Sequence, residues 1–181
     1  IVSHDLRNPL TVAEGHLELA STECDSEHLE HVDHAHERMR TLIEDILALA
    51  REGEVESDVE PVALARVAQR CWANVETDAA TLVTDAERTV RADESRLKQL
   101  FENLIRNAIE HGGEGVTVTV SDLDEGFCIE DDGPGIPGDE HDSVFEAGYS
   151  TSEDGTGFGL NIVERIVEAH DWEIRVTDGP D

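Results

Sequence analysis

The chain has 181 residues, of which 43 are acidic and 13 are basic, so its formal net charge is −30. This balance argues against nucleic acid as a partner, because proteins that bind a phosphate backbone need clustered basic side chains. No apolar run reaches the ~20 residues of a membrane-spanning helix, and the first residues do not read as a signal peptide, so we expect a soluble, cytoplasmic segment.

Two amphipathic helices are predicted at the start of the chain. Apolar residues recur at steps of three and four over residues 6–20, and again over residues 29–50, with a break at residues 21–27. Two such helices joined by a short turn form an antiparallel hairpin. Because one hairpin is too small to bury the apolar face of both helices, we expect two copies to form a four-helix bundle, and hence a homodimer.

An acidic, non-periodic stretch at residues 52–61 predicts a linker. We therefore expect residues 1–54 to form the helical hairpin and residues 55–181 to form a second domain. That domain mixes short strands with helices, which predicts an α/β fold with helices on one face of a sheet. Strands are expected at residues 81–84, 89–92, 116–120, 127–130 and 172–176, and helices at residues 63–75, from Asp93 onward with Asp93 as the N-cap, and at residues 157–169.

The first chemical motif is SHDLRNPL, residues 3–10, on the first helix. His4 lies roughly 160° around the helix from the apolar face, and Asn8 follows one turn later on the same side. A neutral imidazole can act as a nucleophile while a carboxylate holds its second nitrogen, and Asp5 is the nearest carboxylate. Taken alone, an exposed His-Asp pair is an ordinary solvated surface pair, so the specificity lies in the whole octet.

The second motif contains Asn103 and Asn107, which are four residues apart and share one face of a helix. Neutral amide oxygens suit a Mg²⁺ ion that nucleotide phosphates already hold. The alternative for two asparagines on a helix is plain polar surface.

Two glycine motifs follow: EDDGPGIP at residues 130–137, directly after a strand, and GTGFGLNIV at residues 155–163, opening a helix. Glycines let backbone N–H groups approach a ligand, and a helix N-terminus favours phosphate. Each motif alone is weak evidence. DxGxG is often a tight turn, and GxGxG opens many dinucleotide sites, although here no βαβ unit follows it.

Together and in this order, the motifs resemble those of sensor histidine kinases. The octet is similar to their phosphoacceptor box, and NxxxN, DxGxG, a nearby Phe145 and GxGxG are similar to the ATP-binding domain that these kinases share with Hsp90-like ATPases. The resemblance covers nearly the whole chain. It implies a dimerisation and phosphotransfer hairpin followed by a two-layer α/β sandwich.

The resemblance also implies roles for single residues. His4 would accept the phosphoryl group of ATP and pass it to an Asp of a response regulator receiver domain. Asp5 would orient His4 or accept its proton, and Asn8 would help position water if the protein also dephosphorylates its partner. Asn107 would bind Mg²⁺, Asp131 would bond the adenine amino group, and the remaining nucleotide-binding residues would be Asn103, His111, Gly133, Gly135, Ile136, Phe145, Gly155, Thr156, Gly157, Gly159 and Leu160.

Some residues depart from the pattern of the resembling families. Related ATPases that hydrolyse ATP with water carry a Glu base four residues before the magnesium Asn, where this chain has Asn103, which favours a kinase. Many histidine kinases have basic residues that contact phosphate where Glu110 and Ser152 stand, so two such contacts are missing here. Arg106 and His111 are the candidates to replace them. A non-catalytic, nucleotide-binding signalling scaffold remains a second hypothesis.

Three further expectations concern the cell. The acidic side chains of a chain with a net charge of −30 repel one another, and molar salt screens this repulsion. The charge therefore suggests a salt-rich cytoplasm and a halophilic source. Cys24, Cys71 and Cys128 lack metal-ligand spacing, so we expect reduced thiols. Because the first helix of the family extends well upstream of the phosphoacceptor, we expect a fragment whose membrane link, if any, runs through missing upstream regions.

Overall fold

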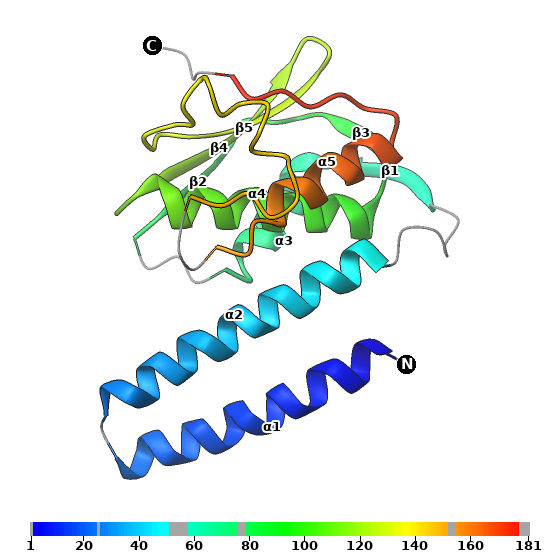
Figure 1. Cartoon of the computed structure of the whole chain (residues 1–181). Helices are drawn as coiled ribbons and strands as arrows, with labels where there is room; N and C mark the ends of the chain where they lie inside the picture. The colour runs from blue at the N-terminus through cyan, green and yellow to red at the C-terminus, as the bar shows by residue number, and fades with distance from the viewer. Residues whose placement is uncertain (1, 25, 51–57, 76–78, 152–154, 178–181) are drawn as a thin grey trace. The chain divides into compact units, whose positions relative to one another are not determined.

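The structure is a computed structural model, and its course is shown in Figure 1. For residues 2–7, 23, 27, 30, 37, 44 and 48–50 the description is limited to the backbone. Two compact units make up the chain: residues 1–55 with residues 148–157, and residues 56–147 with residues 158–181. The described residues are 2–24, 26–50, 58–75, 79–151 and 155–177.

The first unit contains the predicted helical hairpin, formed by α1 (Val2–Glu23) and α2 (Glu27–Ala50). The two helices pack along each other through buried leucines, among them Leu10, Leu17 and Leu47. Pro9 lies inside α1, as the octet predicts.

The apolar face predicted for α2 is only partly buried in the hairpin. Val32, Met39 and Ile46 are 41%, 43% and 51% exposed, whereas Leu47 is 7% exposed. A single neighbouring helix covers a narrow stripe, so an apolar face wider than that stripe stays accessible in one copy of the chain.

The second unit contains two small sheets. One pairs β1 (Val59–Ala63) with β3 (Thr89–Asp93), antiparallel; the other has the order β2 (Thr81–Thr84), β4 (Thr117–Leu123), β5 (Gly126–Asp131). In that sheet β2 runs parallel to β4, and β5 runs antiparallel to it. The helices are α3 (Leu64–Trp72), α4 (Glu94–Gly112) and α5 (Gly159–Ala169).

Helices and strands form two layers, as the α/β prediction required (Figure 1). Helix α4 is the centre of this unit: it contacts α3, α5 and strands of both sheets. Its buried face carries large apolar side chains, which include Leu97, Leu100, Phe101 and Ile105. Asp93 caps its first turn by accepting hydrogen bonds from the N–H groups of Ser95 and Arg96, as predicted.

Two strand predictions were wrong. Strand β1 occupies residues 59–63, where the sequence predicted the end of a linker. The strand predicted at residues 172–176 does not form: within the described residues 155–177, this stretch joins no sheet. Its exposure alternates from Trp172 to Val176, which explains the prediction, but no neighbouring strand supplies a hydrogen-bonded ladder.

Candidate functional site

The DxGxG turn lies against the C-terminal end of α4. A Cβ atom on Gly133 would stand 2.6 Å from the Cα of Gly112, the last residue of α4. It would also stand 2.7 Å from Asp131 Oδ1, which accepts a hydrogen bond from the Gly133 N–H at 3.0 Å. The chain can pass α4 this closely only because residue 133 has no side chain.

The last glycine of the GxGxG motif lies against the middle of the same helix. A Cβ atom on Gly159, the first residue of α5, would stand 3.3 Å from Asn103 Oδ1 and 3.5 Å from Asn107 Oδ1. The structure therefore brings the two predicted asparagines together with the N-terminus of α5. A helix N-terminus presents free N–H groups and a favourable dipole for phosphate.

Helix α4 thus connects two chemically different ends of a candidate site. From Asn103 to Gly112 the helix advances nine residues, or about 13 Å at ~1.5 Å per residue. One end carries the exposed carboxylate of Asp131, and the other carries amides and the start of α5. An elongated ligand with a hydrogen-bonding base at one end and phosphates at the other matches this arrangement.

Asn103 has a different environment from Asn107. Its side chain is 4% exposed; its Nδ2 donates to the Gln99 carbonyl at 2.9 Å, and its Oδ1 accepts from Arg106 Nη2 at 2.6 Å. Asn107 is half-buried and lies one turn further along. The Arg106 contact was not predicted, although a spacing of three residues on a helix could have suggested it.

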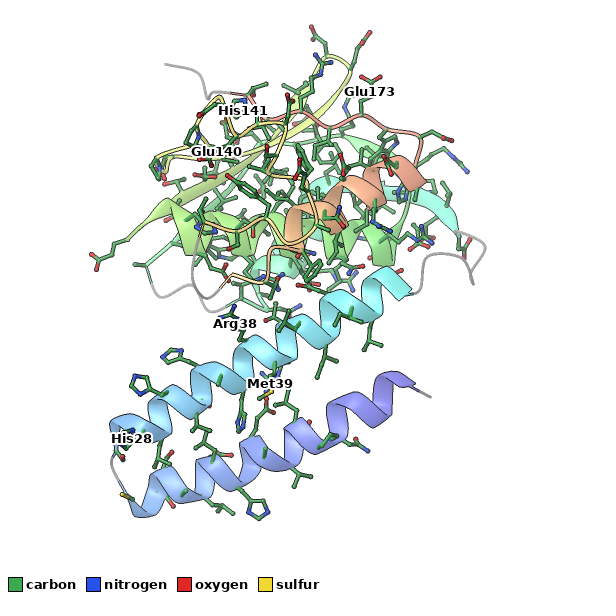
Figure 2. The ribbon with its side chains drawn as sticks, in the orientation of Figure 1. His28, Arg38, Met39, Glu140, His141 and Glu173 are labelled. Carbon is green, nitrogen blue, oxygen red and sulfur yellow. The ribbon has the colours of Figure 1, made fainter. Side chains whose placement is uncertain are left out.

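The loop after DxGxG is held by residues that the sequence analysis missed. Asp132 accepts a hydrogen bond from the Thr117 N–H at 2.7 Å, and this bond lowers the pKa of its carboxyl. His141 Nε2 contacts the carbonyl oxygen of Ile136 at 2.9 Å, and Figure 2 shows His141 on the connection between β5 and α5. Gly135 has φ +73°, which only glycine adopts readily.

Phe145 and Leu160, two more predicted residues of this unit, lie at α5. The Asn161 side chain, 9% exposed, donates from Nδ2 to the Phe145 carbonyl at 3.0 Å and so ties Phe145 to α5. Leu160 is half-buried, whereas His111 is exposed at the end of α4. The sequence marked Phe145 and Leu160 but gave no sign of the Asn161 contact.

Three predicted residues of the GxGxG motif, at positions 155–157, belong to the unit that contains the hairpin. Gly157 has φ +72°, and a Cβ atom on it would stand 2.5 Å from the carbonyl carbon of Gly148. Thr156 Oγ1 donates a hydrogen bond to Oδ2 of the buried Asp45 at 2.7 Å. Gly155 is half-buried and precedes them.

The residues of the octet are only partly described. Helix α1 includes His4 and Asp5, but their side chains lie outside the described ones. Asn8 is exposed. Among the described residues, no cluster of three or more His, Cys, Asp or Glu side chains could hold a metal ion, and no helix is long and apolar enough to cross a membrane.

Two known domain families match the sequence in the predicted order. Residues 1–54 match the His Kinase A (phospho-acceptor) domain, and residues 92–181 match the histidine kinase-, DNA gyrase B-, and HSP90-like ATPase domain. The sequence is also 30% identical to a mycobacterial sensor histidine kinase, MprB, over 62% of this chain and 80% of that one, with a TM-score of 0.55. The chain belongs to the sensor histidine kinase family.

Other histidine kinases match over nearly the whole chain. Sporulation kinase C of Bacillus subtilis is 27% identical over 97% of this chain, and the sensor histidine kinase CpxA of Escherichia coli is 26% identical over 99%. The structure of full-length ShkA in complex with AMPPNP covers 93% of this chain at 28% identity and a TM-score of 0.66. The chain spans 44% of sporulation kinase C, 43% of CpxA and 40% of the ShkA chain.

Proposed function

We propose that this histidine kinase segment binds Mg-ATP and transfers its γ-phosphoryl group to His4, from which the group passes to an Asp of a response regulator receiver domain. One observation carries the proposal: both glycine motifs and both asparagines meet on α4, with the Asp131 carboxylate at one end and a helix N-terminus at the other. The complex of ShkA with AMPPNP supports nucleotide binding in a related kinase.

His4 is the proposed nucleophile. Its unprotonated ring nitrogen forms a bond to the γ-phosphorus, the bond from that phosphorus to the β,γ-bridging oxygen breaks, and ADP leaves. The proton on the other ring nitrogen passes to Asp5 or to solvent. Positioning and electrostatics provide most of the rate in such transfers, so the distance between His4 and the bound nucleotide decides activity.

Asn107 is the proposed magnesium ligand of the protein. It is half-buried, and its Oδ1 lies beside the start of α5, where phosphates would lie. When bound, Mg²⁺ would neutralise charge on the phosphate oxygens. A neutral amide suits an ion whose other ligands are phosphates and water.

Hydrolysis of ATP by water is not part of the proposal. Asn103 occupies the place of the general base in related ATPases, and an amide cannot accept a proton at neutral pH. Glu102 lies next to it in the sequence but is paired with Lys98 at 3.2 Å. His4 therefore remains the acceptor of the phosphoryl group.

The proposed partners are a second copy of the chain and a receiver domain. The exposed Val32, Met39 and Ile46 support a dimer through the hairpin. A cytoplasmic location, a phosphatase activity that uses Asn8, and adaptation to a salt-rich cytoplasm belong to the same proposal. The last of these rests on the charge of −30.

Autophosphorylation tests the proposal directly. The chain is incubated with γ-labelled ATP and Mg²⁺ in molar KCl, beside the His4→Gln variant. Acid-labile label that is absent from the variant supports the kinase and its acceptor together. ATP binding without any label favours the non-catalytic scaffold, and label that persists in His4→Gln places the acceptor elsewhere.

A further inference from the structure

The triphosphate group of ATP carries several negative charges, which favour a cationic side chain beside it. This chain has few basic residues. Basic residues number 13 in 181, and Glu110 and Ser152 stand where many histidine kinases carry basic side chains. Arg106 follows Asn103 by three positions on α4, so its side chain can reach the same end of the site.

Arg106 lies at that end of the site. Its Nη2 donates to Asn103 Oδ1 at 2.6 Å, and the same oxygen would be 3.3 Å from a Cβ atom on Gly159. The guanidinium group and the first residue of α5 therefore both lie close to Asn103 Oδ1, and Asn107 Oδ1 lies beside the same residue of α5. Arg106 itself is half-buried, so the residue is partly accessible to a ligand.

Asn103 is arranged as a support and not as a ligand. Its Nδ2 is used by the Gln99 carbonyl, its Oδ1 is used by Arg106, and the side chain is 4% exposed. A buried amide with both ends bonded has a fixed orientation, and it fixes the guanidinium that it accepts from. A guanidinium held in this way loses little conformational freedom when it binds phosphate.

We propose that Arg106 is the residue whose positive charge contacts the nucleotide phosphates in this kinase, and that Asn103 is the positioning residue that holds it. This inference rests on the proposed function, because it assumes that the site on α4 binds ATP. It assigns Asn103 an indirect role and leaves Asn107 as the asparagine that contacts the metal-phosphate group.

Calorimetric titration of the whole chain with ATP and with adenosine tests the inference. In Arg106→Gln, we expect ATP affinity to fall about tenfold to 100-fold, as for loss of a charge-assisted hydrogen bond, while adenosine affinity stays unchanged. Arg66→Gln removes the same charge from an exposed position on α3 and should leave both affinities unchanged. Arg106→Lys should recover part of the ATP affinity.

A double-mutant cycle tests the role of Asn103. Asn103→Ala should weaken ATP binding in the wild type but have little further effect in Arg106→Gln, because its contribution passes through Arg106. Equal additional losses in both backgrounds would overturn the positioning role. Circular dichroism and thermal melting identify any variant that fails to fold, and Arg106→Lys then provides the comparison.

The remaining outcomes separate this inference from the proposed function. A wild-type chain that does not bind ATP overturns the proposed function. A wild-type chain that binds ATP, with an Arg106→Gln variant of unchanged ATP affinity, overturns the inference alone. Equal losses of ATP and adenosine affinity in Arg106→Gln also overturn it, because they show a structural effect without preference for phosphate.

Discussion

Gly133 of the DxGxG turn approaches Gly112 at the end of α4 so closely that position 133 has no room for a larger residue, and Val116 leaves none at position 112. A Cβ atom on Gly133 would stand 2.6 Å from the Gly112 Cα, and one on Gly112 would stand 2.3 Å from a methyl carbon of Val116. The contact sets the position of Asp131 relative to α4, since the Gly133 N–H donates to the Asp131 carboxylate.

Gly133→Ala should weaken the binding of both ATP and adenosine. Relief of the clash requires the turn to move away from α4, at a cost of about 1–3 kcal/mol, which corresponds to roughly tenfold to 100-fold in affinity. Titration calorimetry with both ligands measures the effect. Gly138→Ala is the matched control, because a Cβ there meets nothing within 4 Å; an equal loss in the control would refute the role of the close contact.

Asp93 should make the kinase less stable in acid. Burial alone would raise the pKa of Asp93, but hydrogen bonds from Ser95 and Arg96 outweigh it and keep the pKa below its ordinary value of 3.8. A lowered folded-state pKa means that the stabilisation is present above 3.8 and is lost as pH falls through the folded value.

Asp93→Ala should lower the free energy of unfolding by about 1 kcal/mol near neutral pH, as expected for loss of an N-cap. The difference between wild type and variant should shrink as the carboxyl is protonated. Urea unfolding at several pH values measures it, and Asp139→Ala, at an exposed position, controls for the loss of a charge. A difference that stays constant down to strong acid would show that the cap does not depend on ionisation.

The elements of the second unit were predicted where local sequence determines them. Asp93 was recognised as an N-cap because its side chain bonds to N–H groups two and three residues later, a local interaction. Strand β1 was missed because acidic residues and Pro61 suggest a linker, and only its pairing with β3 makes it a strand. The prediction of a strand at residues 172–176 was wrong for the opposite reason: the exposure alternates as in a strand, but within the described residues no neighbouring strand pairs with it.

The structure brings the predicted motifs together, but the sequence did not show the contacts between them. The spacing placed Asn103 and Asn107 on one face of α4, and their roles toward a nucleotide stay predictions. The contacts of Asn103 with Gln99 and Arg106 were not predicted. The meeting of Gly112 with Gly133 joins residues of two distant elements, and no local pattern encodes such an approach. Tertiary packing supplies this information.

The hairpin should dimerise through the exposed apolar face of α2. Val32, Met39 and Ile46 are spaced seven residues apart, so they lie on one face, and they are 41–51% exposed in a single copy. Met39→Glu should shift the chain from dimer to monomer in analytical ultracentrifugation, because the charge would be buried on association. His31→Glu adds a charge at an exposed position of the same helix and should leave the dimer intact. A wild-type chain that stays monomeric at high concentration would contradict the prediction.

Stability should rise with salt concentration, because the chain carries 43 acidic residues and a net charge of −30. The screening length falls from about 10 Å at 0.1 M to about 3 Å at 1 M ionic strength, so repulsion between carboxylates is strongly reduced at molar salt. Thermal melting in increasing KCl measures the effect on the intact chain.

A variant with fewer charges provides the control. Replacing Glu114, Asp139 and Glu168, which are exposed, by their amides removes three negative charges. The midpoint of thermal unfolding at low salt should then be higher, and its dependence on salt smaller. That variant separates screening from general effects of salt on burial, which would act on both proteins alike. Equal stability at low and molar salt would show that the acidic surface serves solubility alone, and the expectation of a salt-rich cytoplasm would then lose its support.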